Sequence, residues 1–236
     1  MEQTAQTSVR HTVMHSITVL SFFILIHIVF EIRAVSRLLL SIADRHFWNT
    51  YFDLVFYGLF AVLLIVIQHR RLTQSLKEFV RNFIGYLRHI AMALVAAFVL
   101  IALSSVLLEY FAIGGNPNQA MLEKSSSIGP VTEGITIMLI GPFVEEMIFR
   151  DYIYEEVRIR LDGNRKGLIC TWIVFTSLLF TLNHFSPEDF TDVRVMASYL
   201  VIFFEGLAMT ALYEKDRNVI STLIFHVTMN SVAFLT

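Results

Sequence analysis

The sequence contains few charged residues and only one cysteine, and each shortage excludes a class of protein. Charged residues make up 16% of the 236 residues, whereas a soluble domain carries about 25%. The single cysteine, Cys170, excludes an intrachain disulfide and a cysteine-based zinc cluster. The formal net charge of −2 gives no basic excess, so we expect no nucleic acid partner.

Hydrophobic residues, in contrast, make up 56% of the chain and recur in long runs. A membrane-spanning helix needs about 20 mostly apolar residues. The candidate segments are 12–30, 51–67, 89–111, 131–153, 167–185, 195–213 and 218–235. The sequence therefore predicts an all-α, polytopic membrane helix bundle of about seven transmembrane helices, with the lipid bilayer as its surroundings.

Two segments between these spans are amphipathic. Segment 31–49 alternates arginine with leucine and isoleucine, which is typical of an interfacial helix or a tight connection. Segment 72–88 has apolar residues at helical spacing with lysine and arginine between them, so we expect a helix on the membrane surface. The run at 12–30 is followed by charged residues and no small-residue cleavage site, which favours an uncleaved span over a signal peptide.

The distribution of lysine and arginine predicts an orientation. The loops at 68–88 and 154–166 are basic, and we place both in the cytoplasm. The loop at 186–194 is acidic and lies outside in this arrangement. The N-terminus is then cytoplasmic and the C-terminus external, although the arginines of 31–49 fall on the unfavourable side.

The predicted span 131–153 contains the stretch GPFVEEMIFR, which carries three ionisable groups. Each such group costs roughly 2.5–3.5 kcal/mol inside a bilayer. Glu146 and Arg150 are four residues apart and can form an ion pair, but Glu145 points about 100° away and has no partner at that spacing. An unpaired carboxylate in a membrane indicates a functional site. A structural ion pair with a spare glutamate at the interface is the alternative.

Two later spans carry histidines at helical spacing. Phe180 and His184 read F-x-x-x-H, and His226 and Asn230 read H-x-x-x-N, which places each pair on one helix face. A single histidine on an apolar face is more often a packing residue. Glu205, in the predicted sixth span, is a further carboxylate that can pair with an interior group.

The connection between the fourth and fifth predicted spans strengthens the case for a shared site. A hairpin that turns at 162–165 places Glu145 and His184 at similar depth, because a helix rises about 1.5 Å per residue. His226 matches this depth only if the hairpin projects into the cytoplasm. We therefore expect a polar site inside the bundle.

The three motifs E-E-x-x-x-R, F-x-x-x-H and H-x-x-x-N, in this order on membrane helices, resemble those of the CPBP family. This family comprises CAAX proteases and bacteriocin-processing enzymes and is also called Abi. The matching positions are Glu145, Glu146, Arg150, Phe180, His184, His226 and Asn230. The resemblance implies a catalytic core at 130–236. Residues 1–129 carry no such resemblance, and we expect them to form N-terminal membrane helices, with the amphipathic segment 72–88, in the same membrane domain.

The resemblance implies intramembrane hydrolysis of a peptide bond in a membrane-associated peptide or protein. Glu145 is then the general base, His184 orients the water or binds a metal, and His226 with Asn230 stabilises the oxyanion. Glu146, Arg150 and Phe180 support the site. Bacterial relatives are linked to peptide processing and bacteriocin self-immunity, so we expect a bacterial plasma membrane protein.

Two chemistries stay open at this point. In one, Glu145, His184 and His226 bind Zn²⁺, which would lower the pKa of a bound water. In the other, glutamate and histidine activate water without a metal. The chain lacks H-E-x-x-H, and the two histidines lie on separate helices, which slightly favours the second. Ser177 and Cys170 are weaker candidates for a nucleophile, because neither has a base nearby on its own helix.

A non-catalytic class also fits the charge pattern. The protein could be a membrane immunity factor or a scaffold, whose buried charges bind a partner or hold the helices together. Solute transport is less favoured, because the sequence shows no internal repeat. An isosteric change at Glu145 separates these classes, since only a hydrolase needs its carboxylate.

Overall fold

The computed structural model describes residues 41–42, 45–111, 113, 130–161, 166–185 and 192–235. Every secondary-structure element in these ranges is helical, which confirms the predicted all-α class. The predicted first span at 12–30 lies outside the described residues, as does most of the predicted interfacial segment at 31–49.

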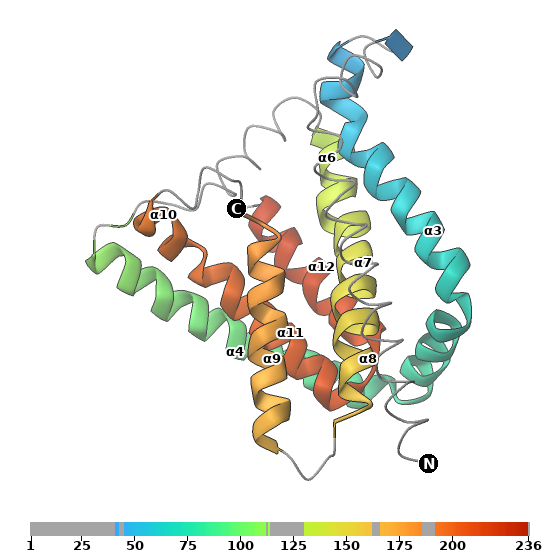
Figure 1. The fold of residues 1–236 in the computed structure, drawn as a ribbon, viewed down its shortest axis with the longest axis vertical. Helices are drawn as coiled ribbons and strands as arrows, with labels where there is room; N and C mark the ends of the chain where they lie inside the picture. The colour runs from blue at the N-terminus through green and yellow to red at the C-terminus, as the bar shows by residue number, and fades with distance from the viewer. Residues whose placement is uncertain are drawn as a thin grey trace, which may run out of the picture.

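The helices form several packed rods (Figure 1). In chain order they are α3 (Arg45–Arg81), α4 (Phe83–Tyr110), α6 (Pro130–Ile135), η1 (Thr136–Ile140), α7 (Gly141–Glu146), η2 (Met147–Tyr154), α8 (Glu155–Arg158), α9 (Lys166–Leu182), α10 (Val193–Ser198), α11 (Leu200–Asp216) and α12 (Val219–Leu235). The elements η1 and η2 are π-helical.

Three helices in the described ranges are long and apolar enough to cross a membrane. They are Tyr51–Arg81, Phe83–Tyr110 and Val193–Asp216, and the shorter apolar helices are Lys166–Leu182 and Val219–Phe234. The chain is therefore an integral membrane protein, but the structure does not confirm seven transmembrane helices. The predicted span at 131–153 is helical throughout, yet its buried charged residues keep it outside this apolar group.

The predicted amphipathic segment at 72–88 is divided between two helices. A bend at Gln68, where φ is −110° and ψ is 17°, separates the predicted span 51–67 from the last part of α3, which ends at Arg81. Helix α4 begins at Phe83, after Asn82, so residues 83–88 belong to the next helix. The location of this segment on the membrane surface stays a prediction.

Helix α11 is the centre of the bundle and packs on α4, α9 and α12. Gly206 allows α9 to approach closely, because a Cβ at that position would lie 3.1 Å from Cδ1 of Phe180 and 3.4 Å from the Ser177 oxygen. Segment α7 contacts α12 and α3. The glutamates of α7 are thereby placed inside the bundle.

Polarity is distributed as a lipid environment requires. Large apolar side chains such as Leu59 and Val66 are exposed on the outside of α3, whereas Glu146, Arg150 and His226 are buried. An apolar surface of this extent marks contact with lipid rather than with water. The buried charges therefore need partners inside the protein.

Candidate functional site

The candidate site is built on one helical rod that runs from α6 to α8. Its backbone stays helical across each junction, but two π-helical segments flank α7. Glu145 and Glu146 lie at the end of α7, and both are buried. Wider π turns are rare and occur most often at functional sites.

The expected ion pair between Glu146 and Arg150 is present. Arg150 Nη1 donates to Glu146 Oε1 at 2.8 Å, and the side chains are 1% and 0% exposed. Arg150 Nη2 also donates to the Gly206 oxygen at 3.4 Å. Its guanidinium lies 4.3 Å from the ring centre of Phe180, in a cation–π contact. The pair therefore connects the rod to both α9 and α11.

His226 joins the two glutamates from α12. Its Nδ1 lies 2.9 Å from Glu146 Oε1, so an N–H here donates to the carboxylate. Its Nε2 faces Glu145 Oε2 at 3.7 Å. Among the described residues, Glu146 thus accepts from two donors, whereas Glu145 has one longer contact, at 3.7 Å to His226 Nε2.

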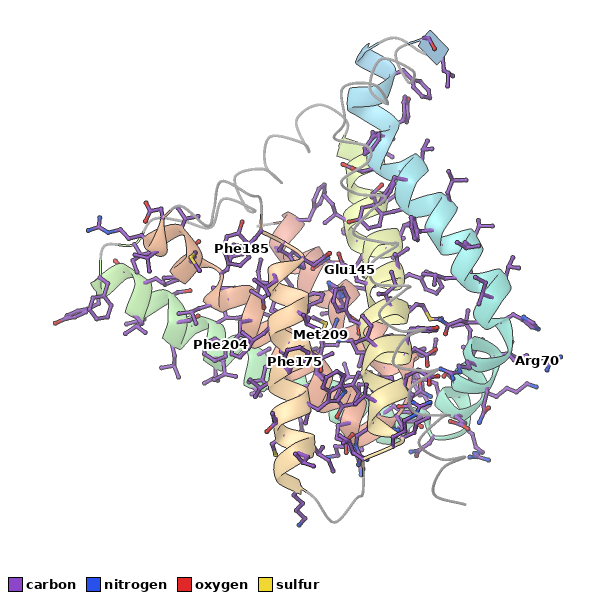
Figure 2. All side chains as sticks on the ribbon, viewed as in Figure 1. Arg70, Glu145, Phe175, Phe185, Phe204 and Met209 are labelled. Carbon is purple, nitrogen blue, oxygen red and sulfur yellow. The ribbon has the colours of Figure 1, made fainter. Side chains whose placement is uncertain are left out.

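The Phe180 ring packs against the rings of both histidines. Figure 2 shows Glu145 inside the bundle. The Phe180 ring lies 4.8 Å from the His184 ring and 5.8 Å from the His226 ring, measured between centroids. His184 Nδ1 lies 2.9 Å from the Phe180 carbonyl oxygen and donates to it. This hydrogen bond leaves Nε2 of His184 as the acceptor.

Asn230 is held by a backbone carbonyl of the rod. Its Nδ2 donates to the Ile137 oxygen at 2.9 Å. In the π turn the Gly141 N–H bonds to Thr136, and the next residue, Pro142, has no N–H to offer to Ile137. The proline leaves this carbonyl without its helical partner, and Asn230 supplies the missing donor. A second N–H of the amide remains for other contacts.

The three predicted metal-ligand candidates do not form a three-ligand set. Glu145 and His226 approach each other, but no group of three His, Cys, Asp or Glu side chains in the described ranges is arranged to hold a metal ion. Nδ1 of His184 is also engaged by its own helix. The donor arrangement therefore does not fit the zinc site considered from the sequence.

Two further residues lie near the site. Tyr57, on α3, lies within electrostatic range of the Glu145 carboxylate, and α3 packs on α7. Glu205, on α11, which the sequence marked as a carboxylate able to pair with an interior group, lies within the same range of Glu145 and His226. Of the two, Tyr57 was not predicted. The N-terminal half of the chain therefore contributes to the site. The only sequence signal for Tyr57 is a tyrosine in the middle of an apolar span.

The alternative nucleophiles lie in unsuitable surroundings. The Ser177 hydroxyl donates to the Ile173 oxygen at 2.7 Å and is buried between α9 and α11. Cys170 is exposed near the start of α9. Neither side chain has a histidine or carboxylate partner within the part of the chain that the structure describes.

Ion pairs fasten the end of the rod beyond the site. Arg158 binds Glu214 at 2.7 Å and Arg217 binds Glu155 at 2.6 Å, which ties α8 to the end of α11. Glu156 accepts from Arg71 on α3 at 2.7 Å. Burial alone would raise the pKa of Glu156, but its hydrogen bonds from arginine hold that pKa below the usual value. These ion pairs thus hold the end of the rod against both α3 and α11.

Removal of Arg150 should destabilise the bundle far more than removal of an outer arginine with the same spacing. We expect Arg150→Leu to lower the free energy of unfolding by about 3–5 kcal/mol, because it leaves Glu146 charged and buried. Arg160→Leu, which breaks the more exposed pair with Glu156, should cost about 1 kcal/mol or less. Thermal unfolding in detergent measures both, and similar losses would contradict the assignment.

Asn230 and Pro142 should be coupled in a double-mutant cycle. Asn230→Ala alone should cost about 1–3 kcal/mol, because the Ile137 carbonyl loses its donor. In a Pro142→Ala background the restored N–H can bond to that carbonyl, so the same change should cost less. Unfolding free energies of the four proteins test this. Strictly additive losses would show that the two residues act independently.

Comparison with known proteins gives one family match. Residues 127–232 match the family model described as Type II CAAX prenyl endopeptidase Rce1-like. No curated protein matches the chain, and no solved structure matches it. The matched range contains Glu145, His184, His226 and Asn230.

Proposed function

We propose that this protein is an intramembrane endopeptidase that hydrolyses a peptide bond of a membrane-associated peptide or protein, because residues 127–232 match the model of the Rce1-like family of type II CAAX prenyl endopeptidases. The family supports a CAAX-type intramembrane protease. One observation carries the assignment of the site to this chemistry. Glu145 is a buried carboxylate whose one polar contact among the described residues is the His226 imidazole, at 3.7 Å.

The proposed general base is Glu145. Its neighbour Glu146 is engaged by Arg150 and by His226 Nδ1, and is therefore a poor proton acceptor. For Glu145, the one polar contact within the described ranges is the 3.7 Å approach to His226 Nε2. A side chain that takes a proton and later returns it must be free to contact water and the leaving group.

The proposed role of His184 is to orient the attacking water. Its Nδ1 is fixed by the Phe180 carbonyl, so Nε2 presents a lone pair that can accept a hydrogen bond from water. The Phe180 ring fixes the plane of the imidazole. Phe180 therefore acts as a positioning residue rather than in the reaction itself.

In the proposed reaction, Glu145 takes a proton from water and the hydroxide oxygen bonds to the peptide carbonyl carbon. The resulting oxyanion accepts hydrogen bonds from Nε2–H of His226 and from the free N–H of Asn230. The carbon–nitrogen bond then breaks, and the leaving amine receives the proton held by Glu145. Glu146 and Arg150 hold His226 and the helix in place throughout.

We extend the proposal to peptide processing or bacteriocin self-immunity in a bacterial plasma membrane, with the N-terminus in the cytoplasm and the C-terminus outside. The resemblance to bacterial CPBP proteins and the basic loops at 68–88 and 154–166 support this placement. A non-catalytic immunity or scaffold protein is the competing function, and the buried Glu146–Arg150 pair would serve it equally well as a structural element.

Glu145→Gln should abolish product formation without unfolding the protein. We expect a loss of at least about 10²-fold in hydrolysis, because the amide cannot accept the proton from water. The measurement compares peptides from cells that express the wild type or the variant at matched membrane levels, with cells that lack the gene as the baseline.

Glu109→Gln provides the matched control for that comparison, because Glu109 is an exposed glutamate in the last turn of α4 and is not one of the site residues. This variant should form the same products as the wild type. If Glu145→Gln restores the phenotype of the wild type and no product differs, the protein is an immunity factor or a scaffold.

Metal removal gives a separate test of the mechanism. Since the described side chains form no three-ligand group, we expect excess chelator to leave the rate of the purified protein unchanged. A rate that falls on chelation and returns with added Zn²⁺ would instead show that Glu145, His184 or His226 binds the metal. The thermal unfolding temperature should be followed in parallel to separate catalysis from stability.

A further inference from the structure

A hollow lies at the bend of α3, outside the proposed catalytic site. It has a volume of about 420 Å³ and is lined by Ile67, Gln68, His69, Arg70, Arg71 and Tyr152. Five of these residues are consecutive in α3, and Tyr152 comes from η2. The bend at Gln68 creates the hollow, because it changes the direction of α3 (Figure 1). None of the lining residues takes part in the proposed hydrolysis.

The two arginines that line the hollow differ in their hydrogen bonds and ion pairs. Arg71 is fixed to the rod, since it donates to the Asp151 oxygen at 3.1 Å and to Glu156 at 2.7 Å. Arg70 is exposed and forms no hydrogen bond or ion pair within the part of the chain that the structure describes. It lies on the outer side of α3 (Figure 2). The hollow therefore has one arginine that can bind a ligand, Arg70, beside Arg71, which is already bonded to the rod. This arrangement suits an anionic ligand.

Gln68 adds a hydrogen-bond acceptor to the hollow, which calls for a donor on the ligand. Its side chain is 7% exposed, and its Oε1 has no hydrogen-bond partner among the described residues. A buried acceptor without a partner is unfavourable, so a ligand with an N–H or O–H group would gain affinity by donating to it. The ligand that satisfies both features is an anion that also carries hydrogen-bond donors.

The position of the hollow indicates where such a ligand comes from. Val62, Val66 and Ile67 precede the bend and are 61%, 65% and 64% exposed. This apolar surface ends at the bend, where His69 and Arg70 begin the basic part of the helix. Acyl chains can lie along the apolar residues while a phosphate reaches the arginine, because basic residues next to a membrane span lie at the level of the headgroups.

We propose that the bend of α3 binds the phosphate of a glycerophospholipid whose headgroup carries hydroxyl donors. Arg70 pairs with the phosphate, Arg71 adds its fixed charge, and Gln68 Oε1 accepts from a headgroup hydroxyl. Phosphatidylglycerol has both features. Phosphatidylcholine has the phosphate, but its quaternary ammonium has no N–H to donate, so it is the natural comparison.

The test measures lipid binding to the purified full chain in detergent by native mass spectrometry, with phosphatidylglycerol and phosphatidylcholine of identical acyl chains. We expect the wild type to bind phosphatidylglycerol about tenfold more tightly, and Arg70→Gln to lower that affinity by about tenfold. Arg88→Gln removes an exposed arginine outside the hollow and should lower it by less than about threefold. Equal losses in the two variants would overturn the proposal.

Two further arms identify the ligand chemistry. Gln68→Leu should reduce the preference for phosphatidylglycerol over phosphatidylcholine, since leucine cannot accept a hydrogen bond, and an unchanged preference would overturn the proposal. Soluble glycerol 3-phosphate supplies the same phosphate and hydroxyls without acyl chains. We expect it not to displace the lipid at equal concentration, and displacement would assign the site to a free phosphate compound instead. Arg70 is exposed, so its replacement should leave the unfolding temperature unchanged.

Discussion

The buried charge cluster of Glu146, Arg150 and His226 is the interaction on which the rest of the structure depends. Away from water, opposite charges attract strongly, but an unpaired charge is expensive. Each member therefore fixes a different part of the bundle. Glu146 holds α12 through His226, while Arg150 reaches the α11 backbone at Gly206 and the α9 ring of Phe180. With Glu146 neutralised by these partners, the adjacent Glu145 remains available for chemistry.

The sequence alone predicted contacts between residues that lie close together in the chain. The pairing of Glu146 with Arg150 follows from their separation of four residues, and the structure confirms it. The contact of His226 with Glu146 joins residues 80 positions apart, so no local pattern could predict it. The role of Asn230 was only partly predictable from the sequence. Pro142 signals a carbonyl that lacks its helical donor, but only the folded structure identifies Asn230 as the residue that supplies it.

Hydropathy was a poor guide to helix boundaries and neighbours, for a physical reason. Helices that face lipid and helices that face other helices are both apolar, so composition cannot tell which side of α3 carries Tyr57 toward Glu145. The same limit explains why the predicted segment 72–88 was not divided at Asn82, since no glycine or proline lies at residues 78–84 to mark the boundary between α3 and α4. The rod from α6 to α8 is helical as expected but too polar to qualify as an apolar span.

The π turn of η1 has a consequence for how this protein can change over evolution. A π turn contains about one residue more than an α turn, so it can absorb a one-residue change in length. Deleting a single residue from 136–140 would let the turn become α-helical, and Glu145 and Glu146 would keep nearly the angular positions that they now hold relative to α6. The same deletion inside the α-helical turn of α7 would rotate the residues after it by about 100° and bring Glu146 to the position of Glu145. The π turn is therefore the place in the rod where a change in length disturbs the two glutamates least.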